Sequence, residues 1–564
     1  MTRSPLRLLS LIAAVLAAVL LATDLAPARA RASTHLVSMF EDDGAAMQTD
    51  PVGTLERLRL LGVQVVRIPV RWFVVAPQHR PAHFNASDPA SPGYSWGLYD
   101  SYVTAAAQVG IAVDLDVAGE AWRWAEGPGI PRGNQPSGHG PWEPNATDYG
   151  QFVHAVAERY SGSYTPPGAS APLPRVSFWS IWNEPDYGPS LAPQGLPGHL
   201  RIDYAPLLYR RLVDAAWKSL LATGHTTRTD TIIFGEVAPR GFPRWGVYSG
   251  MTPMLFLRSL YCVDSRYRPL RGYAARVRGC PTTAAGTRAF PRQHPALFQA
   301  TGFSDHPYMR WYAPNHEPDP DPYTHTSTAD YATLGTMGRF ERGLDRLLRV
   351  YGWHRHLPIY DTEFGYITSP PKRHWAHDHN PWLSQSTAAY YLNWAEYLHW
   401  KDPRLASFMQ YLLYDPEAAL PTNDYGGFAS GLIAYGGRPK QTYYAWRLPL
   451  YLPVTTTRAG RSLEVWGCAR PAHFAVVEDG PQTVQIQSAP GRHPSNAAFH
   501  TVATATISSA SSCYFDQRVR FPGRGVQSVR LIWSYPDQDP MGYFNPLGVT
   551  GALVYSRHVQ IDLR

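Results

Sequence analysis

The chain is poor in cysteine and in charge. Only 4 of its 564 residues are cysteine, and charged residues make up 17% of the sequence. No cysteine spacing matches a zinc finger and no His-Glu-x-x-His sequence occurs, so nothing predicts a metal site, and no cofactor is expected. We expect the formal net charge of +7 to be spread along the chain, without the basic stripe that indicates a nucleic-acid partner.

Long apolar runs are absent beyond the N-terminus. There, Arg3 and Arg7 precede an apolar run over residues 8–22, and Ala28-Arg29-Ala30 forms a small-residue cleavage pattern. We interpret residues 1–32 as a secretory signal. An uncleaved anchor is the alternative, but a run of about 15 apolar residues is short for a membrane span. We therefore expect a secreted, monomeric protein with no stable membrane insertion after cleavage.

Export would place the four cysteines in an oxidising compartment, where disulfides form. Their spacing suggests the pairs Cys262 with Cys280 and Cys468 with Cys513, although four cysteines allow three connectivities. Each bridge would then lie inside one of two predicted domains.

The order of the elements predicts an α/β fold, a (β/α)8 TIM barrel over residues 33–450 followed by a β-sandwich. Strand-like runs alternate with amphipathic helical patterns, which is typical of repeated βα units. We expect the eight strands at residues 35–40, 63–70, 112–117, 176–181, 231–237, 302–308, 358–364 and 405–413. The clearest helices are expected at residues 148–160, 204–221, 332–351 and 385–400. Long segments such as 119–144 and 238–294 follow the strands, and long loops are usually functional.

After residue 450 the pattern changes to short alternating runs, among them 473–477, that glycine, proline and serine interrupt. No apolar period of helical length appears. This pattern predicts a β-sandwich accessory domain over residues 451–564. Such a domain could bind carbohydrate or pack on the barrel, and the lack of a clustered aromatic platform favours packing.

Two glutamates follow strand-like runs at the ends of the predicted fourth and seventh strands. Glu184 stands in Trp182-Asn183-Glu184-Pro185, directly after a buried aromatic run, and Glu363 ends a similar run. The carboxyl ends of barrel strands are where TIM-barrel enzymes carry their chemistry. Glycoside hydrolysis needs two carboxyl groups, one that protonates the leaving oxygen and one that attacks or activates water. Either residue alone could merely pair with an arginine or with loop backbone.

The Asn183-Glu184-Pro185 element, together with the strand-end Glu363, resembles glycoside hydrolase clan A. Within the clan the barrel looks most like families 39 and 5. The resemblance implies a retaining double displacement, in which Glu184 is the acid/base and Glu363 is the nucleophile. One carboxyl group must then stay protonated while its neighbour is ionised, which requires different environments.

The same resemblance implies supporting roles for four residues. Asn183 would bind the 2-hydroxyl of the sugar, although it could instead cap the strand end. His306 would reach the substrate and Tyr308 would donate to the nucleophile, although His306 could be a core histidine. Arg67 would lie beside the nucleophile, where its fixed charge favours an ionised carboxylate, and Arg71 is the alternative.

Loop aromatics are candidates for stacking on sugar faces. Trp72, Trp122 and Trp311 are the predicted substrate-binding residues among them, and Trp124, Trp142, Tyr312 and Trp382 complete the set. Any single one could pack under a loop, but the set favours a glycan cleft. The strand-end acids Glu41, Glu120 and Glu236 receive no catalytic role.

Two departures from the clan leave the sugar open. Residues 116–120 contain no histidine after the third strand, and the eighth strand offers Gln410, Tyr411 and Tyr414 where many members carry a tryptophan. We predict a secreted retaining glycosidase that acts on a poly- or oligosaccharide, of β-linked or arabinofuranosyl type. The alternatives are a transglycosidase on the same site and a non-catalytic, secreted carbohydrate-binding or cell-surface protein on a degenerate barrel.

Overall fold

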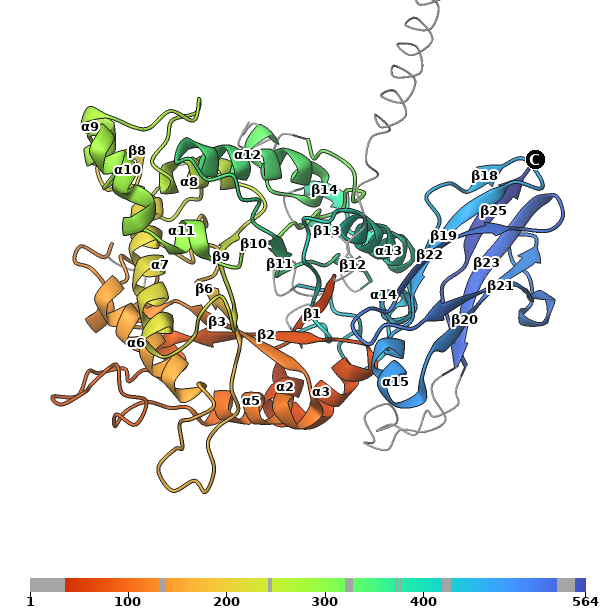
Figure 1. Ribbon diagram of the computed structural model, residues 1–564, viewed down its shortest axis with the longest axis horizontal. Coiled ribbons are helices and arrows are strands. Elements are labelled where there is room, and N and C mark those ends of the chain that lie inside the picture. The colour runs from red at the N-terminus through yellow and green to blue at the C-terminus, as the bar shows by residue number, and fades with distance from the viewer. Residues whose placement is uncertain are drawn as a thin grey trace, which may run out of the picture.

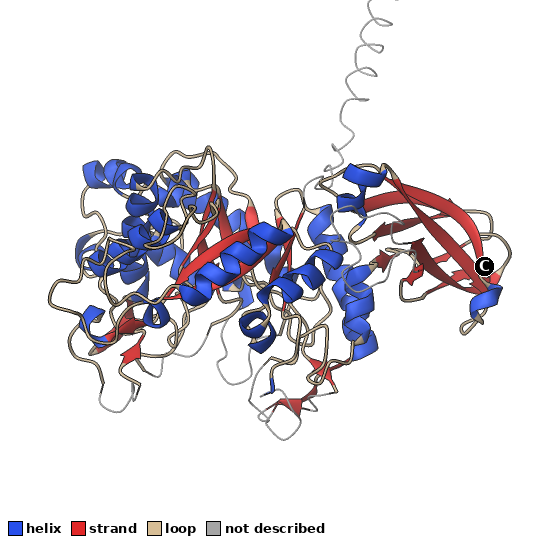
Figure 2. Ribbon diagram, turned by 90° about the horizontal axis from the view of Figure 1, so that it is seen from below, coloured by secondary structure: helices blue, strands red, loops and turns tan. Residues whose placement is uncertain are grey.

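The computed structural model describes residues 36–131, 137–241, 246–319, 328–370, 374–375, 378–417, 428–534 and 553–564. The predicted signal, residues 1–32, lies outside the described residues. A barrel of strands and helices forms the larger part of the molecule, and a β-rich domain lies against one side of it (Figure 1, Figure 2).

Eight parallel strands form the inner wall of the barrel. In chain order they are β1 (Val37–Glu41), β2 (Val65–Arg71), β3 (Ala112–Ala118), β6 (Phe178–Ile181), β9 (Thr231–Val237), β10 (Gly302–Asp305), β11 (Ile359–Asp361) and β16 (Ser407–Tyr411). Each strand from β1 to β11 pairs with the next in this order, and β16 pairs with β1. Hydrogen bonds from Ile359 N to Arg404 O (2.9 Å) and from Ala406 N to Ile359 O (2.8 Å) close the ring. The predicted TIM barrel is confirmed.

A helix follows each strand on the outside of the barrel. These helices are α3 (Pro51–Leu60), α5 (Gly97–Val109), α6 (Ala146–Arg159), α7 (Ala205–Ala222), α8 (Pro253–Leu260), α12 (Met337–Val350), α13 (Gln385–Lys401) and α14 (Gln441–Arg447). Local signals set their ends. Asn145 accepts the N–H groups of Thr147 and Asp148 at the start of α6, and Gly110, with φ 77°, ends α5.

The segment 238–294, which the sequence pattern indicates as a long loop, contains three helices. They are α8, α9 (Gly272–Arg276) and α10 (Ala284–Gln293). These helices have 8, 5 and 10 residues, so each offers too few turns for an apolar period to be recognised.

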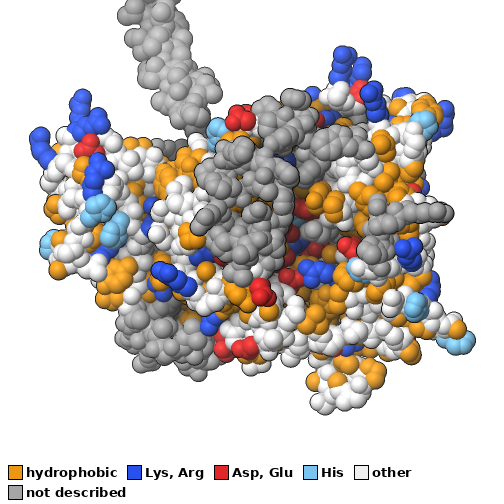
Figure 3. Space-filling view, turned by 180° about the vertical axis from the view of Figure 1, so that it is seen from behind, with side chains coloured by type: hydrophobic (Ala, Val, Ile, Leu, Met, Phe, Trp, Pro, Cys, Tyr) orange, Lys and Arg blue, Asp and Glu red, His pale blue; other side chains and the backbone are white. Residues whose placement is uncertain are grey.

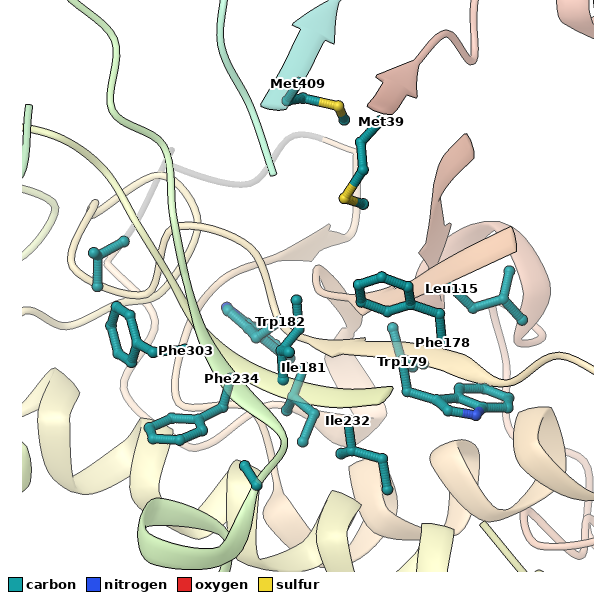
Figure 4. Close-up of a cluster of buried hydrophobic side chains, with 14 of the residues drawn as sticks. Met39, Leu115, Phe178, Trp179, Ile181, Trp182, Ile232, Phe234, Phe303 and Met409 are labelled. Atoms are coloured by element: carbon teal, nitrogen blue, oxygen red, sulfur yellow. The ribbon is translucent and has the colours of Figure 1, made fainter. Parts of the chain in front are cut away.

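Strand residues alternate between the barrel interior and the helix layer (Figure 4). On β6, Trp179 packs against His225, which follows α7, with ring centroids 4.6 Å apart. Phe178 instead packs on Tyr360 of β11, 5.4 Å away, and β11 is not a neighbour of β6 in the sheet. Phe178 therefore points into the barrel, and Trp179 holds the strand to the helices.

The C-terminal domain is a sandwich of two sheets, as predicted. One sheet contains β17 (Leu450–Tyr451), β19 (Ser462–Cys468) and β22 (Tyr514–Arg520). The other contains β18 (Thr456–Thr457), β25 (Val559–Leu563), β23 (Gly525–Ser534), β20 (Gln482–Pro490) and β21 (His500–Ile507), with β24 (Leu553–Tyr555) paired to β23. The strand expected at 473–477 is wrong. That segment lies in helix α15 (Ala472–Asp479), because Ala472 and Ala475, one helical turn apart, both enter the sandwich core.

A buried ion pair joins the sandwich to the barrel. Arg470, after β19, pairs with Glu396 on α13, and both side chains are inaccessible to solvent. The Tyr514 hydroxyl donates to the same Glu396 carboxylate at 2.8 Å. Nearby, Arg557 Nε donates to Asn393 Oδ1 of α13 at 2.8 Å. The sandwich is thus fixed to one barrel helix, in agreement with the packing role.

Both predicted disulfides are confirmed. Cys262 pairs with Cys280 between α8 and α10, and Cys468 pairs with Cys513 at the edge of the sandwich. Within the described ranges, no helix is both long enough and apolar enough to cross a bilayer.

Candidate active site

A cavity of about 520 Å³ lies at the carboxyl ends of the barrel strands. Residues at or just beyond these ends line it, including Arg71 at the end of β2, Ala118 at the end of β3 and Ala238 after β9. Acidic side chains also gather near the centre of the face seen in Figure 3, whereas many basic side chains stand at its periphery.

Glu184 and Glu363 meet in this cavity. Glu184 comes three residues after β6 and Glu363 two residues after β11, and their side chains are 20% and 13% exposed. A carboxylate oxygen of each residue and a ring nitrogen of His306 all lie within 4.8 Å of one another. The backbone at Trp182 and Glu184 is left-handed, with φ 67° and 42°, and Glu184 N donates to Glu236 O at 2.9 Å. This sharp turn, unusual for non-glycine residues, directs Glu184 at Glu363.

Arg67 is the centre of the charge network below the cavity. It points from β2 into the barrel and is inaccessible to solvent. It donates to five side chains: Glu41 and Glu363 (2.9 Å) from Nη1, and Asp116 (2.9 Å), Asn183 (2.8 Å) and Glu236 (3.0 Å) from Nη2. Arg71 instead pairs with Asp43 at 2.5 Å. The structure therefore places Arg67, and not Arg71, beside Glu363.

His306 lies buried between carboxylates. Its Nδ1 is 3.1 Å from Glu184 Oε1, and its Nε2 is 2.9 Å from Glu236 Oε2. Burial alone lowers the pKa of His306, but Glu363, Glu184 and Glu236 together raise it well above its usual range. Because both nitrogens face carboxylate oxygens, the ring is held as an imidazolium that donates on both sides.

The carboxylate of Glu363 accepts two directed hydrogen bonds. Arg67 donates to Oε1 at 2.9 Å, and the Tyr308 hydroxyl donates to Oε2 at 3.2 Å. Burial raises the pKa of Glu363 above its ordinary value, and His306 and Arg67 oppose this shift. The two donors favour and orient the ionised form.

The other acids around Arg67 divide into charged and neutral groups. Burial would raise the pKa of Glu236, but Arg67 and His306 lower it to about 2. Burial outweighs Arg67 at Glu41, whose pKa is well above its usual range, and raises the pKa of Asp116 to about 7. These shifts favour the anion at Glu236 and the protonated form at Glu41, which limits the repulsion in a site that has more carboxyl groups than cations.

Asn183 connects the network to the cavity that it lines. Its Oδ1 accepts from Arg67, so its amide nitrogen remains as the donor. Glu120, a strand-end acid without a predicted role, also lines the cavity, and its carboxylate lies 2.5 Å from His139 Nδ1.

The three predicted stacking tryptophans do not line the cavity. Trp72 is 1% exposed and stacks on Phe152, because it begins helix α4 (Trp72–Val75) directly after β2 and turns back into the core. Trp122 is half-buried and donates to Ala76 O at 2.9 Å. Trp311 packs against Trp382, with ring centroids 6.0 Å apart. Of the seven predicted loop aromatics, Trp382 is the one that reaches the cavity wall.

Other aromatic residues form the cavity wall instead. Tyr187, Tyr411 and Phe428 line it, and Phe428 is 42% exposed with its ring 5.5 Å from that of Tyr308. Tyr187 N donates to Glu184 O, so its nearness in sequence to Glu184 could have indicated it. Phe428 is far along the chain from the end of β16, and no sequence pattern indicates it.

Glu184, His306 and Glu363 are close enough together to bind a metal ion. The donor set does not favour this role. Both nitrogens of His306 face carboxylates, which leaves no lone pair for a metal, and Glu363 already accepts from Arg67 and Tyr308. The cluster is suited to holding carboxyl groups in position.

Neither a protein-family model nor a curated relative matches the chain. Solved structures show low-level similarity. A family 39 glycoside hydrolase from the gut symbiont Bacteroides cellulosilyticus WH2 is 14% identical, with 86% of this chain and 81% of that chain covered and a TM-score of 0.44. A glucosidase from Croceicoccus marinus is 12% identical, with 86% and 94% covered and a TM-score of 0.44. A β-glucuronidase from Bacteroides uniformis is 11% identical over 95% of this chain, which spans 47% of that chain, with a TM-score of 0.38.

Proposed function

We propose that the protein is a secreted glycoside hydrolase that cleaves O-glycosidic bonds of a poly- or oligosaccharide with retention of configuration. The approach of Glu184 to Glu363, with carboxylate oxygens within 4.8 Å at the base of the cavity, carries this proposal. Retaining glycosidases hold their two carboxyl groups ~5 Å apart, whereas inverting enzymes leave ~6.5–9.5 Å for a water molecule. The observed separation favours direct attack by a carboxylate.

Glu363 is assigned as the nucleophile. Arg67 and Tyr308 each donate to one of its oxygens, which stabilises the anion and aims it. In the first step a Glu363 oxygen bonds to the anomeric carbon, and the bond from that carbon to the leaving oxygen breaks. The leaving oxygen takes a proton from Glu184. In the second step Glu184 takes a proton from water, the water oxygen bonds to the anomeric carbon, and Glu363 is released.

Glu184 is assigned as the acid/base because it is the more exposed carboxyl group and lacks the arginine contact that Glu363 has. His306 holds it in place through Nδ1 and is itself held by the Glu236 anion through Nε2. The imidazolium stabilises the carboxylate that forms when Glu184 gives up its proton. Asn183, with its amide nitrogen directed away from Arg67, is assigned to a sugar hydroxyl next to the anomeric carbon.

The test begins with a screen of aryl glycosides and polysaccharides against the mature protein. NMR of the first-formed product on the best substrate should show retained configuration. Glu363→Ala should abolish turnover. Azide should restore turnover of Glu184→Ala and give a glycosyl azide with the same configuration as the substrate, because azide attacks the covalent intermediate from the face opposite Glu363. Glu120→Ala, which removes a cavity carboxyl group without an assigned step, is the matched control.

Near-normal turnover in Glu363→Ala would contradict the nucleophile assignment. Predominant transfer to an added sugar acceptor in dilute substrate would instead assign a transglycosidase. Tight binding of a glycan without turnover across the whole screen would assign a carbohydrate-binding protein.

A further inference from the structure

Residues 255–294 carry an unusual charge. This segment contains eight arginines, no lysine and a single acid, Asp264, so its formal charge is +7. The whole chain has the same net charge of +7. The other 524 residues contain 43 basic and 43 acidic residues and are balanced. The positive charge is therefore concentrated in one segment, and the expectation that it is spread along the chain is wrong.

The segment forms a fixed surface, which we call the basic platform. It contains part of α8 and all of α9 and α10, and the Cys262–Cys280 disulfide bridges it. Arg210 of α7 donates to Arg278 O (2.7 Å) and Gly279 O (3.0 Å), which ties the platform to the barrel. Helices α9 and α10 lie at the end of the barrel opposite the sandwich (Figure 1), and no residue of the platform lines the cavity.

Most of the platform arginines face solvent without an acidic partner. Three are paired: Arg258 with Asp330, Arg268 with Asp264, and Arg278 with Asp203. The remaining five are exposed and, within the described part of the chain, none forms an ion pair: Arg266, Arg271, Arg276, Arg288 and Arg292. The platform therefore presents uncompensated guanidinium groups.

The chemistry of the platform fits an acidic glycan. A guanidinium group is planar, always charged, and donates two parallel hydrogen bonds to a carboxylate or a sulfate. Tyr273, between Arg271 and Arg276 on α9, is 59% exposed and offers a ring face for stacking on a sugar. The disulfide inside the platform fits an oxidising compartment outside the cytosol, which disfavours a nucleic-acid partner.

We propose that the basic platform binds an acidic polysaccharide that carries carboxylate or sulfate groups, at a site separate from the catalytic cavity. The choice of a carbohydrate among polyanions rests on the proposed function, but the charge and exposure of the platform do not. Bound there, the protein would be held on a polyanionic carbohydrate while the cavity stays open to substrate.

The test uses the full mature chain and measures Kd for heparin and for polygalacturonate in 100 mM salt, with neutral dextran as the control ligand. The platform variant is Arg271→Gln/Arg276→Gln/Arg288→Gln. The matched variant is Arg461→Gln/Arg520→Gln/Arg524→Gln, which removes three exposed arginines of the sandwich and changes the net charge equally. We expect the platform variant to weaken binding of at least one acidic polysaccharide by about tenfold or more, and the matched variant by less than about twofold. Thermal unfolding of both variants should match the wild type.

Equal weakening by both variants would show that binding follows net charge, and this would overturn the proposal. No binding to either acidic polysaccharide would do the same. Platform-dependent binding to duplex DNA or to anionic phospholipid vesicles, without binding to the polysaccharides, would assign the surface to another partner. The binding measurements do not need turnover and can be made with Glu363→Ala. The glycosidase proposal is tested by turnover and the platform proposal by Kd, so the failure of one can be told from the failure of the other.

Discussion

Two buried arginines of this molecule, Arg67 and Arg470, lie in opposite kinds of surroundings. Both are inaccessible to solvent and both contact a glutamate. Arg67 faces four carboxyl groups at the base of a cavity, whereas Arg470 faces Glu396 alone and completes its contacts with Trp446, whose carbonyl oxygen it reaches at 2.7 Å. Arg470, where the two domains meet, is thus matched by one carboxyl group. Arg67, at the cavity, faces an excess of carboxyl groups over cations.

This difference distinguishes an ion pair that joins two domains, Arg470 with Glu396, from the charge network around Arg67 in the proposed active site. A matched pair needs only to balance the cost of desolvating its own charges. At Glu41 and Asp116, burial together with neighbouring carboxylates raises the pKa, and such shifts are common where proton transfer is needed. The following predictions test whether the two regions are as distinct as their contacts indicate.

The largest expected effect is on catalysis. Glu363→Gln should lower kcat/KM by roughly 10⁴-fold, because it removes the proposed nucleophile, while the melting temperature stays near that of the wild type. Glu396→Gln, the same change in the other region, should leave kcat within about twofold for the folded protein. Steady-state kinetics and thermal unfolding of both variants check this prediction. A large loss of kcat in Glu396→Gln would mean that the two regions are coupled.

The next effect is on stability. Arg470→Met should lower the free energy of unfolding by about 3–5 kcal/mol, because it leaves the Glu396 carboxylate buried without its cation. In Arg470→Met/Glu396→Leu both charges are gone, so most of that loss should be recovered. Urea unfolding followed by fluorescence measures both values. Equal destabilisation of the single and double variants would show that Arg470 acts by packing and not by charge.

A third effect depends on rising pH. The pKa of Asp116 is about 7 in the folded protein, above its unfolded value near 3.8, so its contribution to stability is full below about pH 3.8 and is lost as pH rises through 7. Between pH 5 and pH 8 this loss is about 3 kcal/mol. Asp116→Asn should remove this loss. Between pH 5 and pH 8 the unfolding free energy of the variant should therefore rise by about 3 kcal/mol relative to that of the wild type. A constant difference across this range would contradict the shift.

The smallest effect has the opposite sign and belongs to the sandwich. His473, on α15, is 2% exposed, and burial together with Arg470 and Arg59 lowers its pKa to about 3. Its unfolded pKa is near 6.5, so the unfolded state gains protons first, and stability is lost as pH falls below 6.5. From pH 7 to pH 5 the loss is about 2 kcal/mol. His473→Leu should flatten this dependence in urea unfolding, and an unchanged slope would show that His473 finds a partner that keeps its pKa near normal.

Much of this architecture could be predicted from the sequence, because it depends on patterns that local chemistry enforces. Runs such as 176–181 and 231–237 are apolar and β-branched, and they form strands whose ends bring Glu184, Glu363 and His306 together. Arg67 lies on such a strand and points to the same place. The two disulfides could also be predicted, from the spacing of the four cysteines along the sequence.

The rest depends on contacts that the sequence does not display. Trp72 follows a strand, but the short helix that it begins turns its ring into the core. Phe428 reaches the cavity from a distant segment through the path of the chain, which no local pattern encodes. Residues 473–477 alternate like a strand, yet two buried alanines one turn apart favour a helix.

The concentration of charge in the basic platform has a consequence for a bulk property of the protein, its isoelectric point. The remainder of the chain is electrically balanced, so the isoelectric point of the entire molecule is governed by about 7% of its residues. Neutralising this one surface would bring the isoelectric point close to neutrality without altering the barrel or the sandwich. Retention on a cation exchanger, which is usually a diffuse property of a protein surface, should here report on a single segment.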